Sequence, residues 1–366
     1  MRRRTFISTA LALAGGGRMF ANEGQGRWDQ AADVLELAVK SKQVESAALF
    51  VSHRGHPFVR HFGKADSNEA MFLIASISKP INVAALMTLY DQGEFKLDDR
   101  VGKFLPEFQG EGRDKVAIRD LLTHVSGLPD QLPENKRLRK KHAPLGEFIQ
   151  HAYQTPLLFE PRSRYRYSSM GILLAARIGE VISGLDMASL VDQRIFKPLG
   201  MTRSVQGLGQ FKKDAMVACQ VEGAAAESGS GDPDAKKWDW NSSYWRNLGA
   251  PWGGVHASAS DIGLFLSEIL GEQGKALKPQ TARLMVQNHS PDGRTPRGLG
   301  FALGAKAGSP GCSQRTFGHS GATGTICWAD AATETICVVL TSLPSTAAKP
   351  HPRELAAEQV AVASLC

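Results

Sequence analysis

The feature that most constrains the fold of this chain is a helical segment with no polar face. Residues 80–92 read "PINVAALMTLYDQ", and apolar side chains occupy nearly every position from Ile81 to Leu89. A helix that is apolar all round is stable in a globular protein only where other elements cover it on every side. Gly93 supplies a stop signal directly after it. We therefore expect a buried helix inside a large domain.

Strands are predicted at both ends of the chain, and helices are predicted between them. The strand signals are at 46–55, 56–63, 298–306, 321–330 and 334–343, and the other helical patterns are at 28–42, 170–182, 262–270 and 354–365. This order predicts an α/β (α+β) fold, in which an antiparallel sheet built from both chain ends is flanked by helices. A mostly helical subdomain, roughly 95–255, is inserted in it, and residues 221–237 are small and polar enough to form a mobile loop.

The N-terminus has the composition of an export signal. Arg2, Arg3 and Arg4 precede a stretch rich in small and apolar residues from Phe6 to Gly17. The pair Arg3-Arg4 is similar to a twin-arginine signal, so we expect residues 1–21 to direct export, to the periplasm. A cytoplasmic protein with an irregular N-terminus is the alternative. No later apolar run reaches eighteen residues, so no membrane-spanning helix is expected in the mature chain.

Charge gives little support to a nucleic-acid partner. The net charge of the 366 residues is +7, and it falls to +3 without residues 1–21, which hold four arginines and no acid. One basic run remains at 136–141, in a stretch expected to be a loop. It is interpreted as a solvated face, and a lip that attracts acidic substrates is the alternative.

Neither the cysteines nor the histidines have the spacing of a metal site. The five cysteines include no C-x-x-C pair, and the ten histidines include no H-E-x-x-H motif. Cys327 and Cys337 flank an expected hairpin turn, where they could form a cross-strand pair or remain two buried thiols, which we favour. No metal and no cofactor are expected.

Ser76 and Lys79 stand three residues apart at the start of the apolar helix. Residues i and i+3 of a helix share a face, so the hydroxyl and the amine come within reach of one another. Pro80 favours the first helical turn, which places Ser76 where free N–H groups stabilise developing negative charge. Burial lowers the pKa of a lysine and lets it accept a proton. A nucleophile and its base are one interpretation, and an N-cap serine beside a surface lysine is the other.

Six segments elsewhere decide between these interpretations. In chain order they are "SISKPINVAALMTLYDQGEFKLDDRVGKFLPEF", "IRDLLTHVSGLP", "YRYSSMGILLAARIGEVISG", "IFKPLGMTRS", "WGGVHASASDIGLFL" and "FGHSGATGTICWAD". Together they resemble the serine β-lactamase-like superfamily, and most of all its class C branch. That branch includes class C β-lactamases, penicillin-binding-protein-like D-alanyl-D-alanine carboxypeptidases and related esterases. The resemblance implies a serine hydrolase domain over residues 28–345, with 346–366 as a C-terminal helix that packs on the sheet.

The resemblance also implies the roles of the site residues. Ser76 would be the acylated nucleophile and Lys79 its proton partner. The family's Tyr-x-Asn motif matches Tyr167-Ser168-Ser169, so Tyr167 would act as acid and base. Ser169, which replaces the asparagine, would take over binding of the substrate amide.

The family's Lys-Thr-Gly strand matches His319-Ser320-Gly321. These three residues would line the substrate site, and Gly321 would let the substrate approach the strand closely. The backbone N–H of Ala322 would complete the oxyanion hole with that of Ser76. Histidine in place of lysine removes a permanent cation, which weakens the expected binding of a β-lactam or peptide carboxylate.

The sequence therefore predicts a serine hydrolase that forms an acyl-enzyme on Ser76. Its partner would be a small-molecule or peptide acyl substrate, and carboxylic esters come first because Ser169 and His319 weaken a polar clamp. A β-lactamase or D-alanyl-D-alanine carboxypeptidase is the alternative. A non-catalytic binding protein on the same fold is a third hypothesis, and the oligomeric state stays open.

Overall fold

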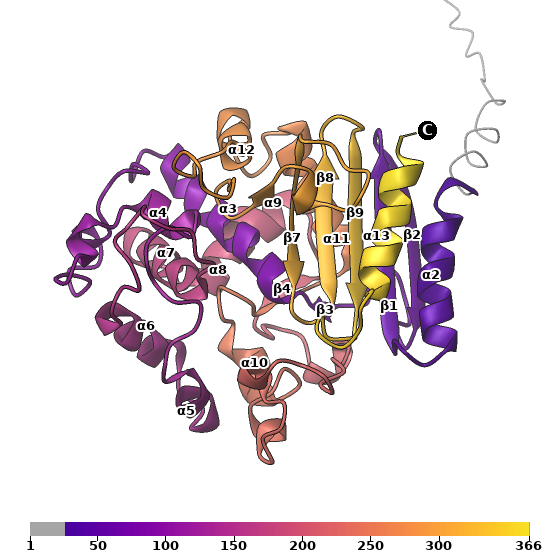
Figure 1. Ribbon diagram of the computed structural model, residues 1–366, viewed down its shortest axis with the longest axis horizontal. Coiled ribbons are helices and arrows are strands. Elements are labelled where there is room, and N and C mark those ends of the chain that lie inside the picture. The colour runs from indigo at the N-terminus through magenta and orange to yellow at the C-terminus, as the bar shows by residue number, and fades with distance from the viewer. Residues whose placement is uncertain (1–25, 366) are drawn as a thin grey trace, which may run out of the picture.

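A six-stranded antiparallel sheet forms one side of the molecule (Figure 1). The structure is a computed structural model that describes residues 26–365. In the spatial order of the sheet, its strands are β2 (His56–Gly63), β1 (Ser46–His53), β9 (Thr335–Thr341), β8 (Thr325–Asp330), β7 (Thr316–Gly321) and β6 (Ala302–Leu303). Strand β1 pairs with β9, which joins the two ends of the chain. The predicted antiparallel sheet of both chain ends is thus confirmed.

Helices cover both faces of this sheet. α2 (Asp29–Lys40) and α13 (Pro352–Ala363) pack side by side on one face, and α11 (Ala259–Gly271) packs on the other (Figure 1). Strand β1 is buried along its whole length, and its side chains alternate between the two cores. Leu49 packs in the core under α2 and α13, whereas Phe50 packs in the core under α11. A Cβ on Gly263 of α11 would overlap the ring of Phe50, so glycine is required at this contact.

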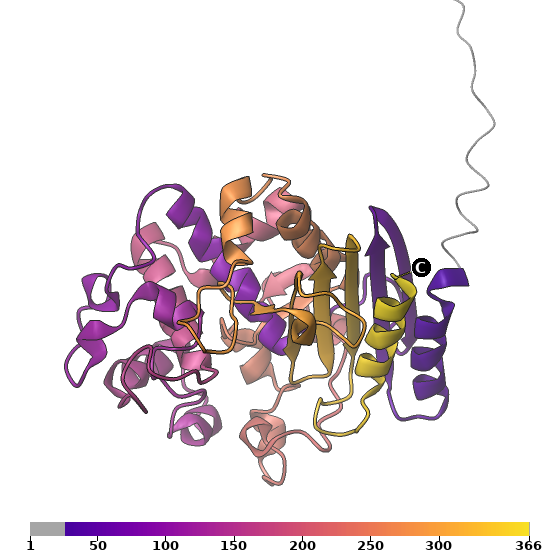
Figure 2. The same ribbon diagram turned by 45° about the horizontal axis from the view of Figure 1, so that its top comes forward.

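The helical half of the molecule lies beside the sheet, and Figure 2 shows the same division from another angle. Its helices are α3 (Ser78–Asp91), α4 (Ile118–Leu122), α5 (Asn135–Lys140), α6 (Leu145–Gln154), α7 (Ser169–Ser183), α8 (Met187–Val191), α9 (Lys197–Leu199), α10 (Ser243–Leu248) and α12 (Pro279–Met285). A small sheet is made of β3 (Phe72–Leu73), β5 (Val255–Ala257) and β4 (Ser204–Gln206). Helix α3 is buried from Ser78 to Leu89, as its apolar pattern predicts.

Two local predictions are wrong. The strand expected at 298–306 is reduced to β6, because Gly300 and Gly304 take positive φ angles that interrupt extended backbone. The loop expected at 136–141 is largely the short helix α5. It is also not uniformly solvated, since Arg139 is buried with its guanidinium 3.8 Å from the ring centroid of Trp245. The segment 221–237 contains two 3-10 turns, Ala226–Ser228 and Ala235–Lys237.

The hairpin of β8 and β9 keeps two thiols apart. Cys327 lies opposite Val338 and Cys337 lies opposite Trp328, so the two cysteines do not face each other. Both are free and buried, which confirms the favoured interpretation. Within residues 26–365, no helix has the length and apolar character needed to cross a bilayer. The predicted export signal lies outside the described residues.

Candidate active site

Ser76 sits at the entry to the buried helix. It is the middle residue of a 3-10 turn, Ala75–Ile77, that leads directly into α3. Both neighbours of Ser76 are buried, whereas Ser76 itself is partly exposed. Ala75 adopts a positive φ of 47°, which is unfavourable for a residue with a Cβ. The turn therefore presents the hydroxyl of Ser76 to the solvent side of an otherwise closed core.

Lys79 is fully buried one turn along the same face. Its Nζ donates hydrogen bonds to the hydroxyl of Ser76 at 3.0 Å and to the carbonyl oxygen of Trp252 at 2.9 Å. Burial lowers the pKa of Lys79 from its ordinary 10.5 to about 7, and the carboxylate of Asp130 opposes part of this shift. Near neutral pH the amine is therefore neutral in a large fraction of molecules and able to accept a proton from Ser76.

Tyr167 lies over this amine. Lys79 Nζ is 4.7 Å from the centroid of the Tyr167 ring. The ring of His124 also contacts Tyr167, with the two ring centroids 4.7 Å apart. Burial raises the pKa of Tyr167 well above its ordinary value, and its interaction with Ser76 offsets part of this rise. The phenol is therefore protonated at neutral pH, as a group that donates a proton must be.

The turn after β7 approaches the Ser76 turn through two threonines. Thr323 Oγ1 donates to the carbonyl of Leu73 at 2.6 Å, and Thr325 Oγ1 donates to the carbonyl of Ile74 at 3.0 Å. Ala322 is the first residue of this turn. Among the described residues, neither the N–H of Ser76 nor that of Ala322 donates a hydrogen bond to the protein. Two free N–H groups on adjoining turns are what an oxyanion hole requires.

Gly321 has a different reason to be glycine from the one that the motif suggests. A Cβ on this residue would overlap the carbonyl oxygen of Ile74 and the hydroxyl of Thr325, and would lie 3.1 Å from the Cβ of Ala75. The absence of a side chain thus allows β7 to pack against the turn that carries Ser76. The close approach is between two parts of the protein.

His319 and Ser320 lie beyond the end of β6. Strand β6 pairs with β7 only at Phe317 and Gly318, so this edge of β7 is not paired by β6 from His319 onward. His319 is buried, and burial together with the nearby Arg297 and Lys79 holds its pKa well below the ordinary value. Its Nδ1 donates to the carbonyl of Ser320 at 2.8 Å. The neutral ring therefore offers an acceptor at Nε2, not the cation that a lysine would supply.

Ser169, like the fully buried Lys79, does not line the cavity. It is 2% exposed and begins α7. Its hydroxyl donates to Asp130 Oδ1 at 2.6 Å, and its backbone N–H donates to the same oxygen at 3.0 Å. Ser169 therefore holds Asp130, whose carboxylate acts electrostatically on Lys79.

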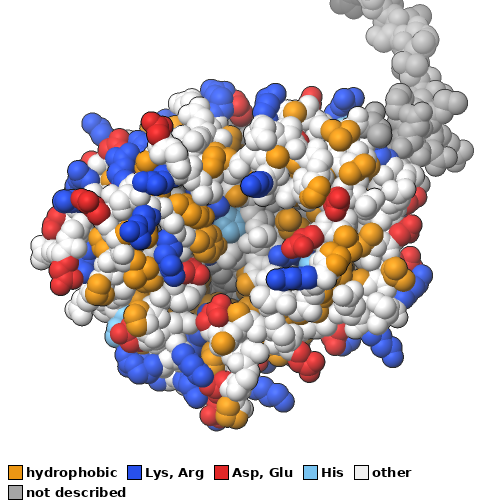
Figure 3. All heavy atoms as spheres, viewed as in Figure 1, with side chains coloured by type: hydrophobic (Ala, Val, Ile, Leu, Met, Phe, Trp, Pro, Cys, Tyr) orange, Lys and Arg blue, Asp and Glu red, His pale blue; other side chains and the backbone are white. Residues whose placement is uncertain are grey.

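A cavity of about 680 Å³ opens beside Ser76. Figure 3 shows a hollow near the centre of the corresponding face. Predicted site residues that line the cavity are Ser76, Tyr167, His319, Ser320, Gly321 and Ala322. The volume suits a small molecule or the end of a peptide.

The sequence analysis did not identify three groups that act on Lys79, namely the carbonyl of Trp252, Asp130 and Arg297. The carbonyl of Trp252 accepts a hydrogen bond from Lys79 Nζ. Asp130 and Arg297 were not singled out at all. A basic residue directly before an apolar stretch, as in "RGLGF", is the one signal that could have drawn attention to Arg297.

The described residues were also compared with the requirements of a metal site. Within residues 26–365, no three His, Cys, Asp or Glu side chains are grouped so that they could hold a metal ion. Two histidines of the first hairpin form hydrogen bonds within the protein: His53 Nδ1 contacts Thr335 Oγ1 and His61 Nδ1 contacts Asn68 Oδ1, both at 2.8 Å.

Solved structures with a similar fold include several kinds of hydrolase. EstCE1, "a hydrolase with promiscuous acyltransferase activity", has a TM-score of 0.75 and 21% identity, and the alignment covers 93% of this chain and 99% of that one. A D-amino acid amidase from Ochrobactrum anthropi has a TM-score of 0.74 and 21% identity, with 92% and 99% covered. At these identities the likeness concerns the fold.

Among curated proteins, one similar chain is from Escherichia coli (strain K12), with the name "Putative D-alanyl-D-alanine carboxypeptidase". It is 25% identical over 287 residues, which are 71% of this chain and 66% of that protein, so slightly less than two thirds of the relative is matched. The profile of the family described as Beta-lactamase matches residues 31–361. This match spans most of the chain and includes every residue of the cavity described above. The chain therefore belongs to the beta-lactamase family, whose fold is that of serine hydrolases.

Proposed function

We propose that this protein hydrolyses carboxylic esters or related acyl substrates through an acyl-enzyme on Ser76. The observation that carries the proposal is the hydrogen bond from the buried, largely neutral amine of Lys79 to the Ser76 hydroxyl. A serine becomes a nucleophile when a neighbouring group takes its proton, and an amine with a pKa of about 7 can do so at neutral pH.

The proposed reaction uses the groups around Ser76 in sequence. Ser76 Oγ attacks the substrate carbonyl carbon while Lys79 accepts the hydroxyl proton. The N–H groups of Ser76 and Ala322 stabilise the negative oxygen of the tetrahedral intermediate. Tyr167 passes a proton to the leaving group, and Lys79 restores the phenol. Water then attacks the acyl carbon while Lys79 accepts its proton. That proton passes to Ser76 Oγ as the bond between Oγ and the acyl carbon breaks, and the acid product leaves.

The environment of His319 supports esters as the first substrate class. A neutral ring whose Nδ1 is bonded to the Ser320 carbonyl has no charge with which to hold a substrate carboxylate at this strand. Ser169 is bonded to Asp130, so its hydroxyl is already donated within the protein. The two positions that would bind a peptide or β-lactam in the related enzymes therefore offer little to either.

A D-alanyl-D-alanine carboxypeptidase or β-lactamase is the second candidate. It is favoured by the name of the curated relatives, several of which match 71–79% of this chain at 25–26% identity. Such an enzyme would use the same Ser76, Lys79 and Tyr167 chemistry and would differ only in what the cavity holds.

One set of substrates and probes tests both candidates. The purified protein is assayed with 4-nitrophenyl esters, nitrocefin and a D-alanyl-D-alanine peptide, and labelled with a fluorophosphonate and with a labelled penicillin. We expect ester turnover and fluorophosphonate labelling at Ser76. Ser76→Ala should lose both, whereas Ser78→Ala should still be labelled. Labelling by penicillin with release of D-alanine would favour the second candidate. Failure of every substrate and both probes would overturn both.

We also propose that residues 1–21 direct export to the periplasm, as the Arg3-Arg4 pair and the following small and apolar residues indicate. The test is the distribution of the full chain between cytoplasm and periplasm in a bacterial host. Replacing both arginines with lysine should retain the protein in the cytoplasm. An unchanged distribution would contradict a twin-arginine route.

A further inference from the structure

Arg353, in the first turn of α13, binds the peptide group next to the proposed oxyanion hole. It is 6% exposed, and its Nη1 donates to the carbonyl oxygen of Gly321 at 2.6 Å. One peptide bond joins this carbonyl to the backbone N–H of Ala322, which donates no hydrogen bond to the protein within residues 26–365. A cation therefore lies at one end of the peptide group whose other end is proposed to hold the oxyanion.

The same guanidinium closes the base of the turn between β7 and β8. Its Nη1 donates a second hydrogen bond to the carbonyl of Thr325 at 2.9 Å, and Thr325 pairs with Gly321 across the hairpin. The Gly321 carbonyl also accepts from the N–H of Gly324 at 3.1 Å. One nitrogen of Arg353 thus holds both ends of the turn that contains Ala322, and the orientation of its N–H is restricted.

The backbone of Arg353 is anchored by the residue that caps α13. His351 Nδ1 accepts a hydrogen bond from the N–H of Arg353 at 3.1 Å, and its Nε2 donates to the carbonyl of Leu343 at 3.2 Å. Both bonds are satisfied by the neutral ring with its proton on Nε2. Burial lowers the pKa of His351 to about 4, so this form persists at neutral pH. The guanidinium extends from a fixed base.

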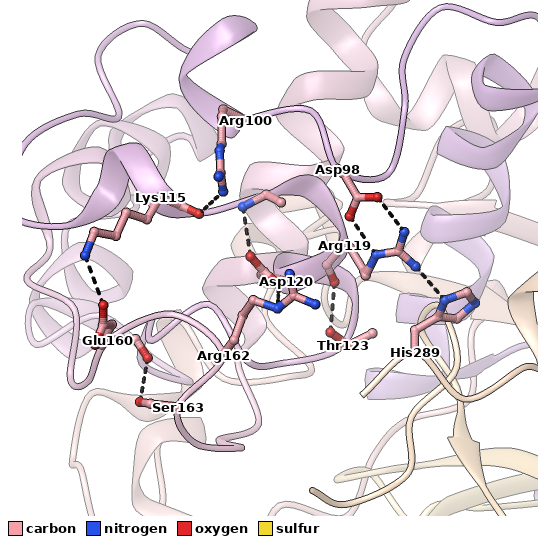
Figure 4. A network of polar contacts seen from close by, with 11 residues as sticks. Asp98, Arg100, Lys115, Arg119, Asp120, Thr123, Glu160, Arg162, Ser163 and His289 are labelled. Carbon is pink, nitrogen blue, oxygen red and sulfur yellow. Dashed lines mark hydrogen bonds and ion pairs between the residues drawn. The ribbon is translucent and has the colours of Figure 1, made fainter. Parts of the chain in front are cut away.

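The carbonyl partners of Arg353 leave its positive charge largely uncompensated. Arg119, by contrast, donates from Nε and Nη2 to the two oxygens of Asp98, at 3.0 and 2.9 Å (Figure 4). The carboxylate near Arg353 is that of Glu354, with an oxygen 3.5 Å from Nη2 and a side chain that is 54% exposed. Water screens an ion pair of this kind, so the field of the cation still acts on the Gly321 carbonyl.

We propose that Arg353 is a positioning residue of the oxyanion hole, which orients and polarises the N–H of Ala322 through the Gly321 carbonyl. This inference rests on the proposed function, because it concerns the same tetrahedral intermediate. A hydrogen bond from a charged donor is stronger than a neutral one, and hydrogen bonds linked through one peptide group polarise each other. A polarised N–H gains more from a negative oxygen than from a neutral carbonyl, and this difference lowers the barrier.

The kinetic test uses a neutral ester, 4-nitrophenyl acetate, so that no charge on the substrate takes part. We expect Arg353→Gln to lower kcat/KM about tenfold, which is less than the roughly hundredfold or greater loss that follows removal of a whole oxyanion-hole donor. Arg353→Lys keeps the cation and should recover most of this loss. Equal kcat/KM in wild type and Arg353→Gln would overturn the proposal.

The matched control is Arg139→Gln. Arg139 is also buried, at 3% exposed, and also donates to a backbone carbonyl, that of Glu227 at 2.7 Å, but it belongs to α5. Its removal shows what the loss of a buried, carbonyl-bound cation does by itself. We expect a change of less than about threefold in kcat/KM, because an effect on stability alone does not alter the folded site. A tenfold loss in this control as well would assign the Arg353 effect to the fold and overturn the proposal.

A boronic acid separates this inference from the proposed function. Ser76 Oγ adds to the boron of phenylboronic acid, and the tetrahedral adduct carries the negative charge that the hole is proposed to hold, without any turnover. Calorimetry should show a Kd about tenfold higher for Arg353→Gln than for wild type, with little change for Arg353→Lys and Arg139→Gln. Equal Kd values for wild type and Arg353→Gln would overturn the inference alone, whereas no binding to wild type would overturn the role of Ser76 as well.

Thermal unfolding shows whether each variant is folded before these measurements. Should Arg353→Gln not fold, Arg353→Met replaces it in both experiments, because an apolar side chain removes the cation without leaving a buried amide unpaired. The expected losses and the outcomes that overturn the proposal are the same for this variant.

Discussion

The Nζ of Lys79 lies 3.0 Å from the Oγ of Ser76 and donates its second hydrogen bond to a backbone carbonyl, that of Trp252. Neither partner carries a negative charge, so neither forms an ion pair that would offset the cost of burying the ammonium form. The lowered pKa of Lys79 and the proposed reactivity of Ser76 therefore have one physical origin, the burial of Lys79 in the core around α3.

The first prediction concerns the pH dependence of hydrolysis. The proposed reaction requires the neutral amine of Lys79, whose pKa is about 7. We expect kcat/KM for a neutral ester to rise with pH through a limb near 7 and then to level off, because Tyr167 keeps its proton throughout this range. The measurement is a pH–rate profile between pH 5 and 9 in buffers of constant ionic strength. A flat profile would contradict the role of Lys79 as base.

The second prediction concerns the charge of Arg297. This cation lowers the pKa of Lys79 from a distance, since it disfavours a second positive charge nearby. In Arg297→Gln the acid limb for a neutral ester should move to higher pH. Lys306→Gln, which removes an exposed cation, should leave the limb where it is. A limb at the same pH in wild type and Arg297→Gln would show that the two groups are not coupled.

The third prediction concerns stability. Above about pH 7 the folded chain holds Lys79 neutral, whereas the unfolded chain protonates it up to its ordinary pKa of 10.5. Unfolding takes up a proton between these values, so this group makes the free energy of unfolding rise with pH. Lys79→Met removes the buried amine and should be inactive, yet more stable at pH 7 by a few kcal/mol.

The check on Lys79→Met is urea unfolding at several pH values. Its advantage over wild type should be largest below pH 7 and shrink toward pH 10. Lys306→Met, which replaces an exposed lysine, should show no such gain. A Lys79→Met protein that is less stable than wild type at pH 7 would mean that the hydrogen bonds of the amine outweigh its burial.

The fourth prediction concerns Gly321. A Cβ at this position would overlap Ile74 and Thr325, so Gly321→Ala should push β7 away from the Ser76 turn. We expect a loss of about 2 kcal/mol in stability and roughly a hundredfold in kcat. Gly146→Ala is the control, because no heavy atom lies within 4 Å of the added carbon. Wild-type kcat in Gly321→Ala would contradict the close packing.

The fifth prediction concerns the tie between the two turns of the oxyanion hole. Thr323→Val keeps the shape of the side chain but removes the hydrogen bond to the Leu73 carbonyl. The buried carbonyl is then left unpaired, which costs about 1–2 kcal/mol, and the N–H of Ala322 is less well placed. We expect kcat to fall roughly tenfold, with a smaller change in KM. Thr346→Val, which removes an exposed hydrogen bond to Gly223, should not affect kcat.

Much of the architecture follows from local pattern. The apolar run from Ile81 to Leu89 could only be a buried helix, and the strand signals at the two chain ends could only be satisfied in one sheet. The spacing of apolar residues predicted helices and strands correctly where one face or every face of the element is buried. It failed at 298–306, where glycines with positive φ angles interrupt an apolar run that otherwise reads as a strand.

For the candidate site, too, some properties could be predicted from the sequence and others could not. The residue types and spacing of Ser76 and Lys79, and the family resemblance of Tyr167 and the 319–321 strand, indicated which groups we propose for the chemistry. Only the tertiary structure decided their state. The burial that lowers the pKa of Lys79, the Asp130 contact that occupies Ser169 and the unpartnered guanidinium of Arg297 all depend on neighbours far away in sequence. The hydration and the protonation state of a side chain depend on the groups that surround it in space. The sequence alone does not show which distant residues those groups come from.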